Sequence, residues 1–212
     1  MGRKFQAILA AAEGVPGWTQ GKEAELIALA SLALPPAATI VEIGVFMGRA
    51  TILLAGPQKL GGGGVVHCVD PFDGSGDGFS VPVYAAELAK SGAASLFDVF
   101  RRTMRQHGLD DGIVAHCGRA EDVGAGWSQP IDLLLLDGDQ SVAGARRAYE
   151  VWSPFLKAGG EIILRNTRDR AFAKDHDGHR RLVQEEITPP RYAQIRQVGA
   201  TTFARKCSQA SP

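Results

Sequence analysis

The stretch Thr39-Ile-Val-Glu-Ile-Gly-Val-Phe-Met-Gly-Arg-Ala-Thr-Ile-Leu-Leu-Ala55 joins a strand pattern to a helix pattern through one short turn. Its first five residues are mostly β-branched or apolar, which suits a buried strand, and the residues from Met47 place apolar side chains at helical spacing. Gly44 and Gly48 lie in the turn, where a missing Cβ allows a sharp bend and lets a ligand approach the peptide groups. The first amides of the helix face the same place. The sequence therefore predicts a strand–turn–helix unit that binds a ligand.

The residues of this turn distinguish two classes of ligand. A nucleotide pyrophosphate requires Gly-x-Gly-x-x-Gly, whereas this turn contains Glu42-x-Gly-x-x-x-Gly. A carboxylate at Glu42 would repel a phosphate and attract an ammonium group. The pattern from Glu42 to Thr51 resembles the first motif of class I S-adenosyl-L-methionine-dependent methyltransferases, whose cofactor carries an amino-acid end and a sulfonium charge. The resemblance implies cofactor contacts from Glu42, Gly44, Phe46 and Gly48. The alternative is an ordinary βα turn that contains two glycines.

The composition is typical of a globular chain. Its 212 residues are 45% hydrophobic, and 23 basic and 23 acidic side chains give a formal net charge of zero. The length suits a single domain over residues 1–212, and the zero charge argues against a nucleic-acid surface. The apolar stretch after Arg3 and Lys4 is too short for a signal peptide, and no stretch is long enough to span a membrane. The three cysteines, Cys68, Cys117 and Cys207, form no disulfide or metal-binding pattern, so we expect reduced, partly buried thiols in a cytoplasmic protein.

Strand and helix patterns alternate along the chain. Residues 1–38 predict two helices, the second ended by Pro35-Pro36. After the strand–turn–helix unit at residues 39–55, the glycines at 61–64 predict an irregular loop. Further strands are predicted at 65–70, 113–117, 131–136, 161–164, 192–197 and 201–206, and further helices at 95–107, 143–153 and 179–186. This order predicts a Rossmann-like, doubly wound α/β sheet of seven strands, mostly parallel with an antiparallel C-terminal hairpin, as the resemblance also implies.

Two features follow the first strand–turn–helix unit. Asp70 ends the second strand, 22 residues beyond Gly48, where an acidic residue in nucleotide-binding folds binds ribose. Its two carboxylate oxygens could accept hydrogen bonds from both ribose hydroxyls, and the alternative is a turn residue. The glycine-rich start of residues 72–95 makes a long connection beside this site, and we expect it to act as a lid over the substrate. Trp18 either caps the pocket or fills a gap in the core.

The ends of two later strands supply the remaining cofactor contacts. The sequence Gly118-Arg-Ala-Glu121 resembles the adenine-binding turn of the family, which implies contacts from Ala120 and Glu121. The most apolar strand pattern ends in Asp137-Gly-Asp-Gln140, at the edge where open α/β sheets bind ligands. Here the chain resembles small-molecule O-methyltransferases, whose central strand ends in Asp-Gly-Asp-His-Ser. The resemblance implies a small-molecule acceptor and a place for Asp137 beside the cofactor and the reacting groups.

The strand that ends in Arg165-Asn166 bears on metal dependence. The resemblance to catechol-type members implies three oxygen ligands for a magnesium ion, of which Asp137 and Asn166 match and Arg165 does not. A guanidinium at this position would repel a divalent ion, so we predict no metal. Arg165 then either stabilises charge on the acceptor or pairs with Asp137 or Asp169. Gln140 aligns with the lysine that acts as base in those enzymes and cannot accept a proton at neutral pH.

A hydroxyl acceptor would still benefit from a general base. His176 and His179 in Asp-His-Asp-Gly-His are the candidates, and solvated loop side chains are the alternative. Metal binding by this pair together with Asp175 and Asp177 is a further alternative, for which the spacing is not diagnostic. We therefore predict a metal-independent small-molecule O-methyltransferase that uses S-adenosylmethionine. The alternatives are a non-catalytic cofactor-binding member and an NAD(P)-dependent oxidoreductase, and the sequence leaves open whether the chain forms a homodimer.

Overall fold

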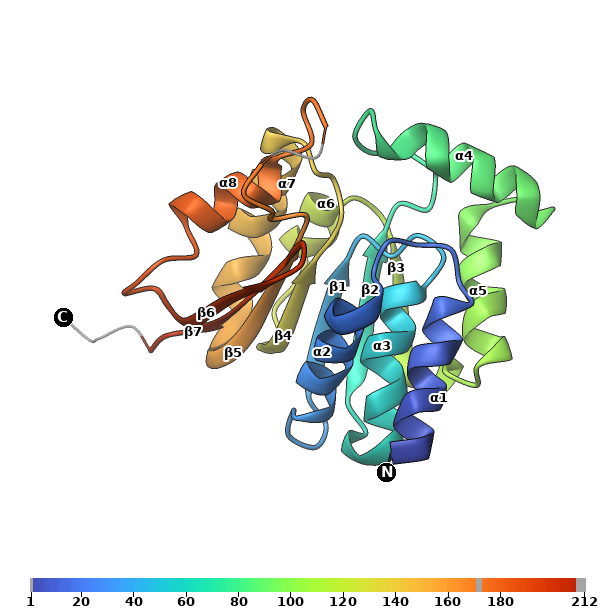
Figure 1. Ribbon diagram of the computed structural model, residues 1–212, viewed down its shortest axis with the longest axis horizontal. Helices are drawn as coiled ribbons and strands as arrows, with labels where there is room; N and C mark the ends of the chain where they lie inside the picture. The colour runs from blue at the N-terminus through green and yellow to red at the C-terminus, as the bar shows by residue number, and fades with distance from the viewer. Residues whose placement is uncertain (1, 171–172, 209–212) are drawn as a thin grey trace.

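Seven strands form one mixed sheet within residues 2–170 and 173–208, which the computed structural model describes. Their order across the sheet is β3-β2-β1-β4-β5-β7-β6 (Figure 1). Strands β1 to β5 are parallel, and β7 pairs antiparallel with both β5 and β6. The strands are β1 (Thr39–Ile43), β2 (Val65–Asp70), β3 (Ile113–Cys117), β4 (Ile131–Leu136), β5 (Leu156–Arg165), β6 (Tyr192–Val198) and β7 (Thr201–Lys206). The predicted Rossmann-like sheet with an antiparallel C-terminal hairpin is confirmed.

Helices cover both faces of this sheet (Figure 1). Helices α1, α2, α3 and α5 lie on one face, α6, α7 and α8 lie on the other, and α4 lies beyond α5 at the end of the molecule away from the N-terminus. Their bounds are α1 (Gly2–Glu13), α2 (Gly21–Leu32), α3 (Arg49–Pro57), α4 (Ser80–Ser91), α5 (Leu96–Gln106), α6 (Ala120–Ala125), α7 (Val142–Trp152) and α8 (Gly178–Glu185). Within the described residues, no helix is both long and apolar enough to cross a lipid bilayer.

The central strand β4 shows why the sheet needs apolar residues on both faces. All six of its residues are buried. Leu133 and Leu135 join the core cluster under α2, α3 and α5, whereas Leu134 and Leu136 join the cluster under α7 and α8. Successive side chains of a strand point to opposite faces, so a strand covered on both sides must be apolar throughout.

The two glycines of the β1–α3 turn are required by packing within the protein. Gly44 has φ +86°, and a Cβ there would clash with the backbone of Gly138 after β4. Gly48 has φ +95°, and a Cβ there would lie 2.6 Å from Cε of Met104 on α5. Both positions also have backbone angles that side chains rarely adopt. The glycines therefore bring the end of β1 against β4 and the start of α3 against α5.

Three local expectations were wrong. Residues Gln58–Gly62 form a π-helical turn, so the loop expected at residues 61–64 is limited to its last two residues, where the Gly64 amide donates a hydrogen bond to the Gln58 side chain at 3.0 Å. Strand β5 begins at Leu156 and includes Gly159-Gly160, because a register shift against β4 accommodates the extra residues. Cys117 is exposed, since β3 lies at an edge of the sheet.

Candidate active site

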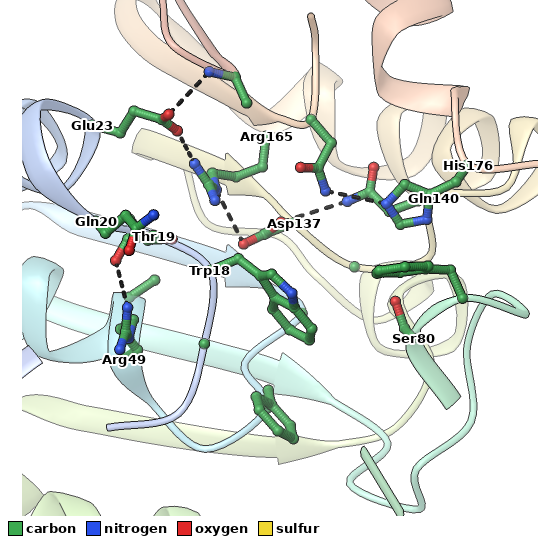
Figure 2. Close-up of a pocket in the computed structure, with 18 of the residues that line it drawn as sticks. Trp18, Thr19, Gln20, Glu23, Arg49, Ser80, Asp137, Gln140, Arg165 and His176 are labelled. Atoms are coloured by element: carbon green, nitrogen blue, oxygen red, sulfur yellow. Dashed lines mark hydrogen bonds and ion pairs between the residues drawn. The ribbon is translucent and has the colours of Figure 1, made fainter. Parts of the chain in front are cut away.

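A pocket opens where β1, β4 and β5 end (Figure 2). The β1–α3 turn and the residues after β4 line it, together with the segment before α2, the start of α4 and the segment after β5. The carboxyl ends of parallel strands are where open α/β sheets bind ligands. Of the residues predicted as functional, this pocket contains Gly44, Phe46, Asp137, Arg165 and His176.

Four side chains form a polar chain along the pocket, from Glu23 through Arg165 and Asp137 to Gln140 (Figure 2). Arg165 is 2% exposed and donates a hydrogen bond to the carboxylate of Glu23. Its Nη1 also lies 2.7 Å from Oγ1 of Thr201, and its Nε lies 3.5 Å from Oδ2 of Asp137. The expected pairing with Asp137 is therefore present. Glu23 was not recognised from the sequence, because it lies 142 residues from Arg165 in the chain.

The two carboxylates beside Arg165 differ in pKa. Burial raises the pKa of Asp137 to about 6, although the nearby guanidinium opposes the shift. Burial would also raise the pKa of Glu23, but hydrogen bonds from Thr201 and Ala200 and the charge of Arg165 hold it below its usual value. Glu23 is thus the carboxylate that remains ionised beside Arg165, and Asp137 is the one whose charge changes near neutral pH.

His176 lies in a second polar group that joins three segments of the chain. Its Nδ1 is 3.0 Å from Oδ1 of Asp77. Its Nε2 is 3.4 Å from Nδ2 of Asn166, a contact that Figure 2 marks with a dashed line. His176 is 3% exposed and Asp77 is 6% exposed. Asp77 also accepts hydrogen bonds from the amides of Phe79 and Ser80 and from the Ser80 hydroxyl. Burial opposes ionisation of Asp77, but the bonds from His176 and Ser80 lower its pKa far below the usual value. The imidazole is therefore held by a fixed carboxylate at the pocket wall.

The expectation for His179 was wrong in both its forms. The side chain is 1% exposed and does not line the pocket, so it is neither placed to accept a proton from an acceptor nor solvated. Its Nδ1 bonds to the backbone carbonyl oxygen of Arg165 at 3.1 Å. Burial lowers its pKa to about 4, so the neutral imidazole predominates at neutral pH. His179 fixes the end of β5 against α8.

Three aromatic rings form one wall of the pocket. The ring centroids of Phe46 and Tyr84 lie 4.8 Å apart, and Trp18 lies 5.7 Å from Phe46 and 6.2 Å from Tyr84. Of the two alternatives for Trp18, the structure favours the pocket, because the side chain is 42% exposed and lines it (Figure 2). Tyr84 comes from α4, so the segment expected to be a lid contributes directly to the pocket.

Asp70 holds the turn between β1 and α3. Its Oδ2 accepts hydrogen bonds from the amides of Val45 and Phe46 at 2.8 and 3.0 Å, and its Oδ1 accepts one from the amide of Phe72 at 2.7 Å. Burial raises its pKa although these bonds oppose the shift. A carboxylate has about four lone-pair sites, so one remains for a ribose hydroxyl. Its expected role toward ribose stays a prediction, to which the structure adds a role in shaping the turn.

The other expected cofactor contacts lie outside the pocket lining. Glu42 is fully buried beneath the turn and accepts a hydrogen bond from Thr51 Oγ1 at 2.7 Å. Burial raises its pKa to about 8, so the carboxyl is mainly neutral at pH 7 and the expected attraction of an ammonium group is weakened. Ala120 and Glu121 start α6, where Glu121 pairs with Arg147 at 3.3 Å. Their contacts with adenine remain a prediction.

Comparison with known proteins identifies the family. A model of the methyltransferase domain matches residues 41–167, which is more than half of the chain. The chain belongs to this methyltransferase family. As expected from the motif at Glu42 to Thr51, it is an S-adenosylmethionine-dependent methyltransferase, and the oxidoreductase alternative is set aside.

Solved structures with the same fold as this methyltransferase share little sequence with it. An O-methyltransferase from Bacillus cereus in complex with SAH is 18% identical, with a TM-score of 0.60, over 96% of this chain and 91% of that chain. A provisionally named O-methyltransferase from Klebsiella pneumoniae is 17% identical, with a TM-score of 0.64, over 97% and 90%. An SAH-bound methyltransferase from Podospora anserina is 12% identical, with a TM-score of 0.64, over 97% and 88%. At these identities the likeness establishes the fold.

The pocket of the methyltransferase suits the charged end of its cofactor. Asp137 presents a carboxylate there, and Oε1 of Gln140 is buried with no hydrogen-bond donor among the described residues. An unpaired buried acceptor is costly unless a ligand supplies the donor. The ammonium group of an amino acid is such a donor, and Asp137 would balance its charge. Asp137 and Gln140 are therefore the residues that would hold this end of the cofactor.

Proposed function

We propose that this methyltransferase methylates a hydroxyl group of a small molecule without a divalent metal, and that His176 is the general base. The observation that carries the proposal is the Asp77–His176 pair at the pocket wall. When Nδ1 of His176 donates its hydrogen to Asp77, Nε2 keeps its lone pair and can accept a proton. This is the arrangement by which a carboxylate fixes the tautomer of a catalytic imidazole and stabilises the imidazolium that forms.

Each residue of the pocket then has a defined task. Asn166 Nδ2 lies 3.4 Å from Nε2 of His176 and lines the pocket, so a bound acceptor hydroxyl would take the place of this amide against the basic atom. The acceptor hydroxyl gives its proton to Nε2, and its oxygen becomes the nucleophile. Bound S-adenosylmethionine supplies an electrophilic methyl group and a neutral thioether as the leaving group. Since such a reaction depends mainly on alignment, positioning by Tyr84 and Trp18 would contribute much of the rate.

Two residues support a metal-independent reaction. The guanidinium of Arg165 lies 3.5 Å from Asp137, in the place where a divalent ion would be expected. Gln140 contributes an amide beside Asp137 in place of an acid or a base. Among the described residues, no group of three or more histidine, cysteine, aspartate or glutamate side chains is arranged to hold a metal. The guanidinium of Arg165 beside Asp137 therefore supports a reaction without a divalent cation.

The experiment is a panel assay that measures S-adenosylhomocysteine formation with small hydroxylated acceptors, with and without EDTA. We expect turnover that EDTA leaves unchanged, and a loss of about 10²- to 10⁴-fold in kcat for His176→Gln with cofactor affinity retained. His107→Gln is the matched control, because His107 is exposed at the end of α5. Asp77→Asn should shift the pH profile of kcat.

Three outcomes would contradict parts of this proposal. Wild-type kcat in His176→Gln would remove its role as base, and activity that requires added magnesium would remove the metal-independent reaction. Tight binding of S-adenosylhomocysteine without turnover on any acceptor would favour the non-catalytic alternative.

A further inference from the structure

The charges that line the pocket are mainly positive, although the chain as a whole has a net charge of zero. Four arginines line it, Arg49, Arg165, Arg168 and Arg170, against the two carboxylates of Glu23 and Asp137. A concave surface with an excess of one charge concentrates ligands of the opposite charge. The identity of the acceptor therefore depends on which of the four guanidinium groups are available to a ligand.

Two of the four guanidinium groups already form ion pairs or hydrogen bonds within the protein. Arg165 pairs with both carboxylates of the pocket. Arg49 donates hydrogen bonds to the backbone carbonyl oxygens of Glu13, Val15 and Thr19, at distances of 3.0, 2.6 and 3.1 Å. Both arginines therefore hold the N-terminal segment and the strand ends in place.

The other two arginines differ from this pair. Arg168 and Arg170 follow β5, line the pocket and are exposed. Across residues 2–170 and 173–208, neither guanidinium has a carboxylate or carbonyl partner. Exposed arginines are common on protein surfaces, and exposure alone does not indicate a binding site. Here, however, two unpaired ones line the same pocket as the aromatic wall formed by Trp18, Phe46 and Tyr84.

We propose that the methyl acceptor is a planar molecule that carries a carboxylate or phosphate group, bound by Arg168 and Arg170. This inference rests on the proposed small-molecule function and adds the chemical class of the acceptor. Guanidinium groups bind carboxylate and phosphate through paired, charge-assisted hydrogen bonds, and the aromatic rings bind a planar apolar part. A cationic acceptor would meet uncompensated positive charge, so the same pocket selects against amines.

The test measures equilibrium binding by calorimetry in the presence of saturating S-adenosylhomocysteine. The four probes share a phenol ring: 4-hydroxybenzoate, 4-hydroxyphenyl phosphate, 4-hydroxybenzamide and 4-hydroxybenzylamine. We expect at least one anionic probe to bind about tenfold or more tightly than the amide and the amine, which corresponds to one retained charge-assisted contact. The tighter of the two anions identifies carboxylate or phosphate as the group of the natural acceptor.

Two double variants localise the effect. Arg168→Gln with Arg170→Gln should abolish the preference for the anionic probe and should leave affinity for S-adenosylhomocysteine unchanged. Arg3→Gln with Arg105→Gln removes the same charge from exposed positions on α1 and α5 that do not line the pocket, and it should keep the preference. The preference in the unaltered protein should also weaken as salt is added, because the arginines are exposed.

Because the readout is binding, this test is independent of methyl transfer. Anion binding that requires Arg168 and Arg170, without turnover, would uphold the acceptor class while the proposed reaction fails for that probe. The proposal is overturned if the amide binds as tightly as the anions, if the preference survives in the Arg168/Arg170 variant, or if none of the four probes binds at millimolar concentration.

Discussion

Replacing Glu23 should destabilise the protein far more than replacing its near neighbour Glu25. The Glu23 carboxylate accepts hydrogen bonds from Arg165, from the Ala200 amide at 3.0 Å and from Thr201 Oγ1 at 2.6 Å. Glu23→Ala would leave Arg165, at 2% exposure, with the Thr201 hydroxyl and with the longer contact to Asp137 as its one remaining ion pair among the described residues. Removing one partner of a buried ion pair costs about 3 to 5 kcal/mol, mainly because the other charge stays buried. This is a large part of a typical stability of about 5 to 15 kcal/mol.

The matched control is on the same helix. Glu25 pairs with Lys22 at 2.8 Å, but both side chains are exposed. Exposed pairs contribute about 0 to 1 kcal/mol, so Glu25→Ala should change the unfolding free energy little. Urea denaturation at pH 7, followed by tryptophan fluorescence, measures both variants, and an unchanged m-value would show that the same transition is compared.

The pH dependence gives a second readout for Glu23. Its pKa in the folded protein lies below the usual 4.5. Its contribution is therefore complete above that value and is lost as the pH falls through the folded pKa. The stability difference between the unaltered protein and Glu23→Gln should narrow in acid. A loss below about 1 kcal/mol for Glu23→Ala at pH 7 would refute the assignment of Glu23 as the main partner of Arg165, given the 3 to 5 kcal/mol expected for a buried pair.

Three further predictions concern single residues. Burial raises the pKa of Glu42 from 4.5 to about 8, so its contribution to stability is complete below pH 4.5 and is lost as the pH rises toward 8. Glu42→Gln should flatten the unfolding free energy over that range, and an unchanged slope in urea titrations would contradict this. Burial lowers the pKa of His179 from 6.5 to about 4. Its contribution to the free energy of unfolding is therefore complete above pH 6.5 and is lost as the pH falls toward 4. His179→Gln should reduce the slope of the unfolding free energy against pH over that range. Asp70→Ala should lower both the melting temperature and the affinity for S-adenosylhomocysteine, because three turn amides lose their acceptor; calorimetry that finds both unchanged would count against this role.

Local patterns in the sequence were sufficient to predict the strands of the sheet. The apolar run Ile131–Leu136 identified the central strand, because a strand covered on both faces cannot alternate with polar residues. The same reasoning failed at Leu156–Gly160. Two adjacent glycines indicate a turn, but a register shift against β4 lets the strand continue through them. Whether the strand continues through the glycines depends on its pairing with the neighbouring strand. That pairing cannot be read from the sequence of one strand alone.

The partners of the pocket residues could not be predicted for a related reason. Arg165 and Glu23 are 142 residues apart, and His176 and Asp77 are 99 residues apart. The sequence shows the charge and chemistry of each side chain, but only the fold determines which two side chains come into contact. Reasoning from the sequence therefore identified His176 and Arg165 as notable but missed Glu23 and Asp77. It also treated His176 and His179 as equivalent, although one lines the pocket and the other is enclosed between β5 and α8.

Arg165 and Gln140 stand where the resemblance to catechol-type enzymes implies a metal ligand and a lysine. These two differences are consistent with each other on electrostatic grounds. A divalent ion about 4 Å from the Arg165 guanidinium would be repelled by several kcal/mol even at an effective dielectric constant of about 20. Arg165 itself is accommodated because Glu23 and Thr201 supply its partners on the side away from Asp137. A lysine in place of Gln140 would then add a second cation beside a carboxyl group whose pKa is already about 6. A neutral amide at position 140 leaves Asp137 with Arg165 as its one cationic partner among the described residues, so the carboxylate remains able to balance a cation that enters from the pocket.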